Sequence, residues 1–404
     1  MSRFLFVTWD GGGNVGPAVE IAKEMQHRGE KVRFLGQEQQ RLALERAGFD
    51  FTAYSRPGSW TAIGKRDSLK NTLGFLSLLI GRGLGRDLIA DVDKTQTDLV
   101  VIDCLLFGAL DAASRAGLRH VVLMHSLFGA IDQKMAGGAP GMVARIVGLR
   151  PRKLWAGAEL VVAATLKELD RPPQPGSPLS LNYTGPAIPE AVETAAQPSV
   201  TNILVSLSTT YIAGQTQALQ HVLDALTDLP VHAVVTTGPA IDPEELRTPA
   251  NAEMHRYLPH AEVMPTVSLV IGHGGHSTTM LALAHGLPLL ILPMNLMFDQ
   301  EIIGHAIQKN GAGVTLASSS SPTQIRAAIE QVLADGTYRQ EAMRLGAAIR
   351  ATRGTQAAAT LLQTQAIQVE LRDTEGALRL TRWQYLRQVL AHCWQGVSGT
   401  EALS

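Results

Sequence analysis

The sequence predicts two doubly wound α/β domains that face each other across a proline-rich linker. The chain has 404 residues, which suggests two or three domains at ~150 residues each. Short apolar runs without polar alternation, typical of parallel strands buried on both faces, alternate with helical patterns on both sides of the linker. We expect residues 1–180 to form the first domain, 181–200 the linker and 201–370 the second domain. Residues 371–404 are expected to form a C-terminal helix that packs back on the first domain.

The first domain opens with a βαβ unit. Strands are expected at Arg3–Trp9 and Lys31–Leu35, and the helix between them spans Pro17–Arg28. Its apolar residues recur at helical spacing, from Ala18 to Met25, so they form one buried stripe. Further strands of this domain are expected at Asp98–Asp103, His120–Met124 and Glu159–Ala163.

The second domain follows a stretch, 171–199, in which seven prolines exclude a central strand or buried helix. Its strands are expected at Asn202–Leu207, Val231–Thr236, Ser268–Gly272, Leu289–Leu292 and Gly313–Leu316. The segment Ser59–Arg86 fits the alternation poorly. It is either a surface helix pair with a basic face or the wall of an apolar substrate cleft.

Composition excludes several classes of protein. Hydrophobic residues make up 45% and charged residues 18%, which argues against disorder and coiled coils. Lys and Arg (35) balance Asp and Glu (36), so no nucleic-acid partner is expected. Two cysteines make neither a disulfide framework nor a zinc cluster. No leader peptide precedes the first strand and no transmembrane segment of ~20 apolar residues is found, so we expect a cytoplasmic protein.

The loop after the first strand is rich in glycine. Gly11, Gly13 and Gly16 fit the dinucleotide pattern G-x-G-x-x-G, but Gly36 and Gln37 stand where an acidic ribose ligand is expected. The loop is therefore a dinucleotide site, a structural turn or, as we favour, the lining of a substrate cleft. No metal is expected, since the D-x-D run at 91–93 has the pattern of a solvated helix face.

Two polar residues end neighbouring strands of the first domain. Asp103 and His125 stand at carboxyl ends of expected parallel strands, which open toward the same crevice. Asp103 is alternatively a helix N-cap, and His125 is alternatively a structural histidine.

The segment 268–288 is the most specific in the sequence. It predicts a strand, a glycine turn and a helix that starts at Ser277 or Thr278 and ends at Gly286. Gly274 and Gly275 would let a ligand approach the backbone at the helix N-terminus, where free N–H groups bind phosphates. An ordinary glycine-rich turn is the alternative. A carboxylate and an amide, Asp299 and Gln300, follow the next strand and suit the hydroxyls of a sugar.

These motifs resemble the donor signature of family 1 glycosyltransferases, of the GT-B superfamily. The match comprises H-x-G-x-x-[ST] at 273–278, A-x-x-x-G-x-P at 282–288, and Asp-Gln at 299–300. Residues 257–260 look like the W-x-P-Q box of that family, and 183–186 resemble its Y-x-G-P linker. The resemblance runs from residue 3 to about 365 and is nearest to the bacterial macrolide and natural-product branch.

The resemblance implies inverting transfer of a hexose or deoxyhexose from a dTDP- or UDP-sugar to a hydroxyl of an apolar natural product, as in antibiotic tailoring. It implies no metal and no cofactor beyond the nucleotide sugar, in a monomer or homodimer. The implied donor-binding residues are Ser208, Thr209, Thr210, Tyr257, Leu258, His273, Gly274, Gly275, Ser277, Thr278, Asp299 and Gln300. The implied acceptor-binding residues are Trp9, Gly12, Gly13, Trp60 and Phe128.

Two departures from the family pattern affect the chemistry. Asn14 occupies the position of the usual catalytic histidine and cannot act as a base, so Asp103, Asp10 or His125 is expected to replace it. Leu281 stands where the family usually places a glutamate on the ribose, which favours dTDP. Three alternatives to a transferase are a catalytically silent partner protein, a nucleotide-dependent oxidoreductase and a sugar-nucleotide epimerase.

Overall fold

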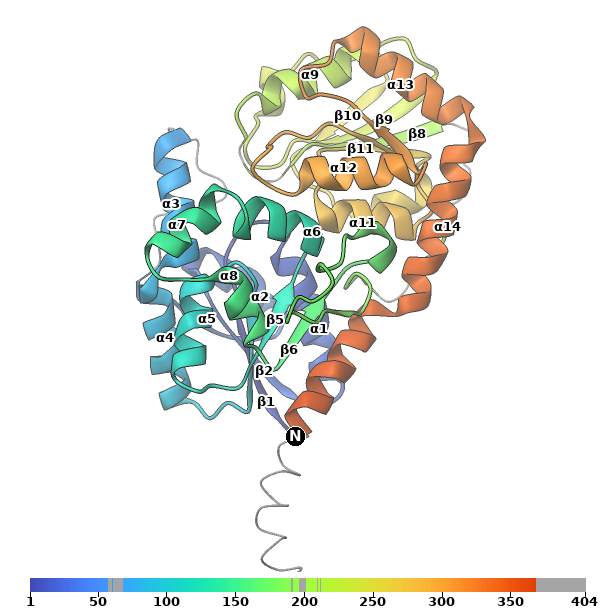
Figure 1. Ribbon diagram of the computed structural model, residues 1–404. Coiled ribbons are helices and arrows are strands. Elements are labelled where there is room, and N and C mark those ends of the chain that lie inside the picture. Colours follow the sequence, from blue (N-terminus) through green and yellow to red (C-terminus); the bar gives the residue numbers. More distant parts are fainter. Residues whose placement is uncertain are drawn as a thin grey trace, which may run out of the picture.

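The computed structural model describes residues 1–56, 60, 68–189, 192–195, 201–208, 210 and 212–367. The chain forms two α/β units, one above the other in Figure 1, each built on a fully parallel sheet. The predicted fold class is therefore confirmed. Within the described residues, no helix is both long enough and apolar enough to cross a membrane.

The first sheet has the strand order β3-β2-β1-β4-β5-β6-β7. Its strands are β1 (Arg3–Val7), β2 (Lys31–Gly36), β3 (Asp50–Ala53), β4 (Leu99–Asp103), β5 (His120–Met124), β6 (Leu160–Ala163) and β7 (Asn182–Tyr183). Its helices are α1 (Val15–His27), α2 (Arg41–Arg46), α3 (Ser68–Ile80), α4 (Arg82–Lys94), α5 (Phe107–Arg115), α6 (Phe128–Ile131), α7 (Ala139–Ile146) and α8 (Pro151–Ala156). A short π-helix, η2 (Asp132–Ala136), joins α6 to α7.

The second sheet has the order β10-β9-β8-β11-β12-β13. Its strands are β8 (Thr201–Ser206), β9 (Val231–Thr236), β10 (Ala252–His255), β11 (Leu269–Gly272), β12 (Leu289–Ile291) and β13 (Gly313–Thr315). Its helices are α9 (Gln215–Leu226), α10 (His260–Val263), α11 (His276–Ala284), α12 (Gln300–Lys309), α13 (Pro322–Ala334) and α14 (Gly336–Thr352).

All ten predicted strands are present, with ends within two residues of those expected. Three strands were not predicted: β3, β7 and β10, and each lies at the edge of a sheet. The two residues of β7 fall inside the expected linker, where they extend the first sheet beside β6.

The predicted stripe of α1 is buried. Ile21 and Met25 are inaccessible to solvent and pack with Phe4, Phe6 and Phe34 of the first sheet. This is the packing that an amphipathic helix makes on a strand layer buried on both faces.

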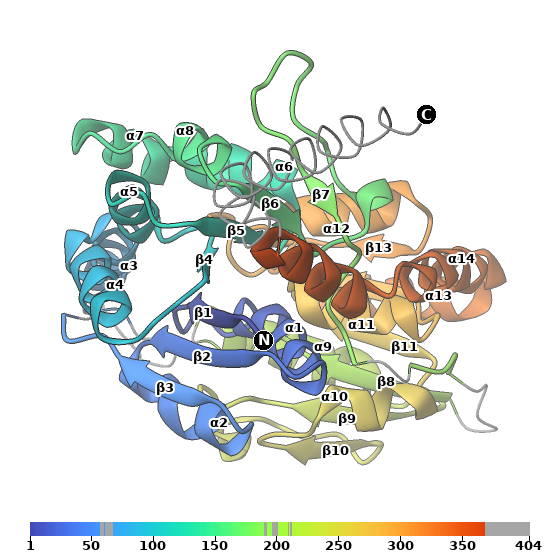
Figure 2. The same ribbon diagram turned by 90° about the horizontal axis from the view of Figure 1, so that it is seen from below.

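The C-terminal helix crosses back to the first domain earlier than the sequence predicted. Helical residues 354–367 follow α14, and Ala358 and Leu362 are buried in the same core cluster as Phe4 and Ile21. Arg28 of α1 donates hydrogen bonds to Thr360 and Gln363 of this helix, which lies beside α1 in Figures 1 and 2. The expected crossing segment, 371–404, lies outside the described residues.

The described part of the segment 59–86 forms the helix pair of the first prediction, α3 and α4, with basic residues on its surface and apolar residues in the domain core. Phe75, Leu78 and Leu79 of α3 are buried in the first-domain core, together with Trp60. Lys70, Arg82 and Arg86 are exposed. One side of α3 therefore supports the interior of the domain, and the other side contributes to a basic surface.

Candidate active site

Both sheets reverse their strand order at one point, and the pocket lies where these two points meet. The reversal falls between β1 and β4 in the first sheet and between β8 and β11 in the second. In doubly wound sheets ligands bind at the carboxyl ends of the strands at this position. The pocket takes residues from both domains, among them Asn14, His125, His273 and Thr278.

Asn14 holds the glycine loop in place. Its Oδ1 accepts a hydrogen bond from the Gly11 N–H at 3.0 Å, and its Nδ2 donates to the Trp9 carbonyl at 3.0 Å and to Asp103 Oδ2 at 3.2 Å. A Cβ atom on Gly11 would lie 2.5 Å from the Trp9 ring and 2.8 Å from Asn14 Oδ1. The loop therefore needs glycine at position 11, and Asn14 joins it to the end of β4.

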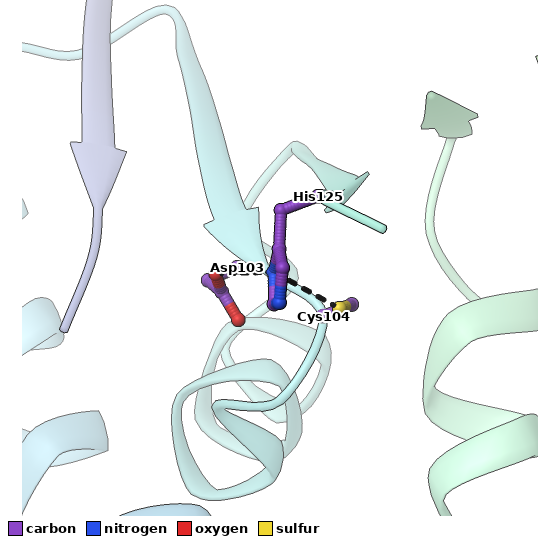
Figure 3. A group of neighbouring side chains, drawn as sticks. All are labelled: Asp103, Cys104 and His125. Atoms are coloured by element: carbon purple, nitrogen blue, oxygen red, sulfur yellow. Dashed lines mark hydrogen bonds and ion pairs between the residues drawn. The ribbon is translucent and has the colours of Figure 1, made fainter. Parts of the chain in front are cut away.

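Asp103 and His125 form a buried pair beside this loop (Figure 3). Asp103 Oδ2 lies 2.9 Å from His125 Nδ1, and Asp103 Oδ1 accepts a hydrogen bond from the Leu105 N–H at 2.9 Å. Burial lowers the pKa of His125, but the neighbouring Asp103 and Cys104 outweigh this effect and raise it well above its ordinary value. Burial raises the pKa of Asp103, yet His125 outweighs it and the net direction is down. Because Nδ1 faces Asp103 and His125 lines the pocket, its Nε2 is the ring nitrogen available to a ligand.

Cys104 completes this cluster. Its Sγ lies 3.6 Å from His125 Nδ1, on a different side from Asp103 in Figure 3. Burial raises the pKa of the Cys104 thiol more than the neighbouring His125 lowers it. The sequence analysis gave Cys104 no role in the site.

The glycine turn after β11 has the shape that the sequence predicted. Gly274 has φ +84°, and a Cβ atom there would lie 2.8 Å from the Gln300 carbonyl oxygen. A Cβ atom on Gly275 would lie 2.6 Å from Nε2 of His273. Position 274 therefore requires glycine, whereas a side chain at position 275 would require the His273 ring to shift. The helix α11 starts at His276, one residue before the predicted start, with Gly275 as its N-cap.

His273 and the first turn of α11 form the second-domain wall of the pocket. Burial lowers the pKa of His273 to about 4, so its ring is neutral and donates through one nitrogen. Ser277 Oγ donates to the Gly13 carbonyl at 2.8 Å, which connects this helix directly to the first-domain loop. Thr278 Oγ1 lies 3.5 Å from Nδ1 of His260.

Asp299 and Gln300 stand at the start of α12, after β12. Gln300 Oε1 accepts hydrogen bonds from the N–H groups of Met294 and Asn295, so its carbonyl oxygen shapes the preceding loop. Asp299 accepts a hydrogen bond from Ser126, across the two domains. Burial raises the pKa of Asp299.

Most of the predicted site residues line this pocket. Those that do are Trp9, Gly13, Asn14, Trp60, His125, Ser208, Thr210, His273, Gly275, Ser277, Thr278, Asp299 and Gln300. Asp103 reaches the pocket through His125, and Gly274 shapes the turn behind it. Thr209 lies outside the described residues.

The remaining predicted residues do not line the pocket: Asp10, Gly12, Phe128, Tyr257 and Leu258. The Asp10 backbone is bonded to Gln37 and Trp60. The Phe128 ring packs on Trp155.

In the second domain, Tyr257 is 73% exposed. Leu281, expected near the ribose, packs against the second-domain core. A residue's place in a motif did not fix the direction of these side chains.

Sequence reasoning missed several lining residues. They are Leu105, Ala130, Ile131, Lys134, Met135, Ser206, Ile212, His260, His276, Asn295 and Phe298. His260 and His276 belong to motifs already recognised, which was a usable signal. The apolar members have the residue types of an ordinary core, so no pattern distinguished them.

An aromatic cluster closes one end of the pocket. Trp9 and Trp60 contact Phe75 with ring centroids 5.7 and 5.3 Å apart. Phe298 of the second domain packs edge-on against Phe75 at 5.4 Å. Trp9, Trp60 and Phe298 of this cluster line the pocket, so the pocket has an apolar part with residues from both domains.

Comparison with known proteins shows which class of protein this chain resembles. Residues 220–362 match the family model described as erythromycin biosynthesis protein CIII-like, C-terminal domain. The chain is 25% identical over 402 residues to 4'-demethylrebeccamycin synthase of Lentzea aerocolonigenes, covering 85% of this chain and 94% of that protein.

Two solved structures share the fold. The calicheamicin glycosyltransferase has a TM-score of 0.70 at 20% identity, covering 90% of this chain and 98% of that chain. The glycosyltransferase VinC in complex with DTDP has a TM-score of 0.68 at 17% identity, covering 91% of this chain and 100% of that chain.

The two facing parallel-sheet domains and the pocket at their switch points define the GT-B architecture. Relatives that match most of the chain, or about a third of it, are named as synthases or glycosyltransferases, so the chain is a glycosyltransferase, and residues 220–362 resemble the erythromycin biosynthesis protein CIII-like C-terminal domain.

Proposed function

We propose that this enzyme transfers a hexose or deoxyhexose, with inversion, from a nucleoside diphosphate sugar to a hydroxyl group of an apolar natural product. The observation that carries the proposal is the Asp103–His125 pair, 2.9 Å apart, at the pocket wall that faces the glycine turn of the second domain. A base on one side and a phosphate cradle on the other match an in-line displacement.

His125 is the general base in this proposal. Its Nε2 removes the proton of the acceptor hydroxyl, whose oxygen forms a bond to the anomeric carbon as the bond to the diphosphate breaks. Asp103 holds Nδ1 and stabilises the positive charge that the imidazole gains. Asn14 at the family's usual base position keeps a positioning role, through its bond to Asp103.

The start of α11 stabilises the leaving diphosphate. Its free backbone N–H groups and its positive dipole end favour anions, and Thr278 adds a hydroxyl that lines the pocket. We propose that these groups, with neutral His273, supply the charge stabilisation that a metal provides in other transferases. The aromatic end of the pocket suits the apolar acceptor. Cytoplasmic location remains a prediction from the sequence, and a monomeric or homodimeric state remains a prediction from the family resemblance.

Replacing the base tests the mechanism. His125→Ala and Asp103→Asn are expected to lower turnover ~100- to 10,000-fold, the usual contribution of general base catalysis. Donor affinity, measured by calorimetry, should stay within a factor of two, because neither residue belongs to the phosphate cradle. His305→Gln on the exposed face of α12 is the control.

Full turnover in both base variants on an unactivated hydroxyl would reject His125 as the base. A purified chain that hydrolyses or transfers no sugar from any nucleotide donor would instead favour the silent-partner alternative.

The nucleotide is proposed to be dTDP rather than UDP. The support is the dTDP complex of a neighbour with the same fold. In thermal denaturation, dTDP at 100 times its Kd should add about 2.7 kcal/mol of stability, and UDP at the same concentration should add less. An equal or larger shift with UDP would contradict the preference, and His273→Ala should weaken both responses.

A further inference from the structure

One helix of the first domain exposes apolar side chains to solvent. On α7 and the turn after it, Met142 is 58% exposed, Ile146 79% and Val147 37%. Met142 and Ile146 are four residues apart and lie on one helix face, and exposed Arg145 and Arg150 flank them. We call these five residues the α7 face. Contiguous exposed apolar side chains rimmed by polar ones mark interaction sites.

The surroundings of the α7 face are strongly basic. Residues 68–86 and 133–158 contain eight Lys and Arg residues and no Asp or Glu, in a chain of net charge −1. Lys134 pairs with Glu301 and Arg152 with Asp132. The other six basic residues have no acidic neighbour within these two segments.

The two acid-free segments are neighbours in space. Helix α3 packs against α7, and the two lie together at the same side of the first domain in Figure 1. Arg82, at the start of α4, donates a hydrogen bond to the Val147 carbonyl at 3.3 Å. Leu73 on α3 adds a further apolar side chain that is 56% exposed. The basic charge and the apolar side chains therefore belong to one surface region.

This region adjoins the pocket. The π-helix η2 leads directly into α7, and its residues Lys134 and Met135 line the pocket. Arg145 of the α7 face donates a hydrogen bond to the carbonyl of Ala136, the last residue of η2, at 2.9 Å. A partner bound to the α7 face would therefore lie one helix away from the pocket wall.

We infer that the α7 face docks on an anionic lipid bilayer. Short apolar side chains that insert at the headgroup level, surrounded by arginine and lysine, are the combination that binds such an interface. Charge complementarity selects this partner, because the surface is positive on both helices and carries no acidic side chain from either segment. A second copy of the chain in a twofold arrangement would bring two basic faces together, and like charges would repel.

Vesicle co-sedimentation with the full chain, without donor or acceptor, tests this inference independently of the transfer reaction. One preparation of vesicles contains phosphatidylcholine alone, and the other also contains about 30 mol% phosphatidylglycerol, at roughly the same total lipid concentration. The wild type should bind the anionic vesicles and release as salt rises to ~0.5 M, because screening shortens the range of the attraction. Each arginine near the membrane surface is expected to raise the partition coefficient between vesicles and water about fivefold.

The double variant Ile146→Ser/Arg150→Gln should bind at least tenfold more weakly. The matched control is Leu42→Ser/Arg46→Gln on α2 of the same domain, where an exposed leucine and arginine lie beside Glu38 and Glu45. The control should bind like the wild type, and all proteins should unfold at the same temperature, because the substituted side chains are exposed.

Two results would overturn the inference. One is equal binding of the wild type and the α7 variant to anionic vesicles. The other is a wild-type dimer, detected by light scattering, that becomes a monomer in the α7 variant, together with no binding of any of the proteins to vesicles. The α7 face would then bind a second copy of the chain.

Discussion

Asn14 has a structural part in the glycine loop of the first domain. It stands where the related family carries its base, yet its amide makes three hydrogen bonds that hold the glycine loop against Asp103. The base proposed here, His125, comes from the end of β5 and meets the same aspartate from another side. The sequence placed Asp103 and His125 at neighbouring strand ends. Their separation and the ring nitrogen involved depend on side-chain packing, which sequence patterns do not encode.

The pH dependence of activity follows from this pair. His125 acts as a base only when unprotonated, and its pKa lies well above the ordinary value because Asp103 and Cys104 outweigh burial. Activity should therefore rise with pH through that raised pKa. Asp103→Asn removes the negative charge, so the midpoint of kcat/KM against pH should move to lower pH while the maximum falls. The exposed-pair control Asp111→Asn should leave the midpoint unchanged, and an unshifted midpoint in Asp103→Asn would contradict the assignment.

At the scale of elements, buried strands were predictable and edge strands were not. The strand β4 is fully buried and reads as a continuous apolar run, whereas β3 is half exposed and has the polar residues Asp50 and Thr52. A two-residue strand such as β7 has no periodicity to detect. The glycine turn before α11 was predictable because a Cβ atom at either of its glycines would come close to a neighbouring group. The direction of the Leu281 side chain on α11 was not predictable, because this helix has core contacts on several sides.

The turn before α11 provides a stability test. Gly274→Ala places a Cβ atom at φ +84° and 2.8 Å from a backbone carbonyl, and a non-glycine residue in this region costs about 1–3 kcal/mol. Urea denaturation should show a loss of at least that size, with weakened donor binding. Gly336→Ala at the start of α14, where a Cβ atom meets nothing within 4 Å, is the control and should be neutral or slightly stabilising. Equal stability of the two variants would contradict the strained-turn assignment.

At the scale of the molecule, the two domains meet through polar bonds, an aromatic contact and a shared apolar cluster. Ser277 bonds Gly13, His276 Nε2 lies 2.9 Å from Thr165 Oγ1, and Glu168 pairs with Arg344. Leu127, Leu166 and Leu169 of the first domain are buried in one cluster with core residues of the second domain. The predicted two-domain plan is confirmed, but contacts between the domains join residues more than a hundred positions apart and could not be read from the sequence.

Phe298 offers a test of the aromatic end of the pocket. Phe298→Ala removes its edge-on contact with Phe75, worth about 0.5–1.5 kcal/mol beyond the area buried. The KM for an apolar acceptor should rise roughly two- to tenfold, with the KM for donor nearly unchanged. Met297→Ala, next in the chain and 39% exposed, is the control. A change confined to donor KM would place Phe298 in the donor site instead.

The helix at 354–367 has a consequence for biosynthesis. Its residues Ala358 and Leu362 complete the core that Phe4 and Ile21 begin, yet the ribosome makes them only after the whole second domain. At about 5–20 residues per second, the ~180 residues between β7 and this helix take roughly 10–40 s to synthesise. During that interval the nascent first domain lacks the side chains of Ala358 and Leu362 from its core. The first domain to emerge from the ribosome is thus the last to be completed.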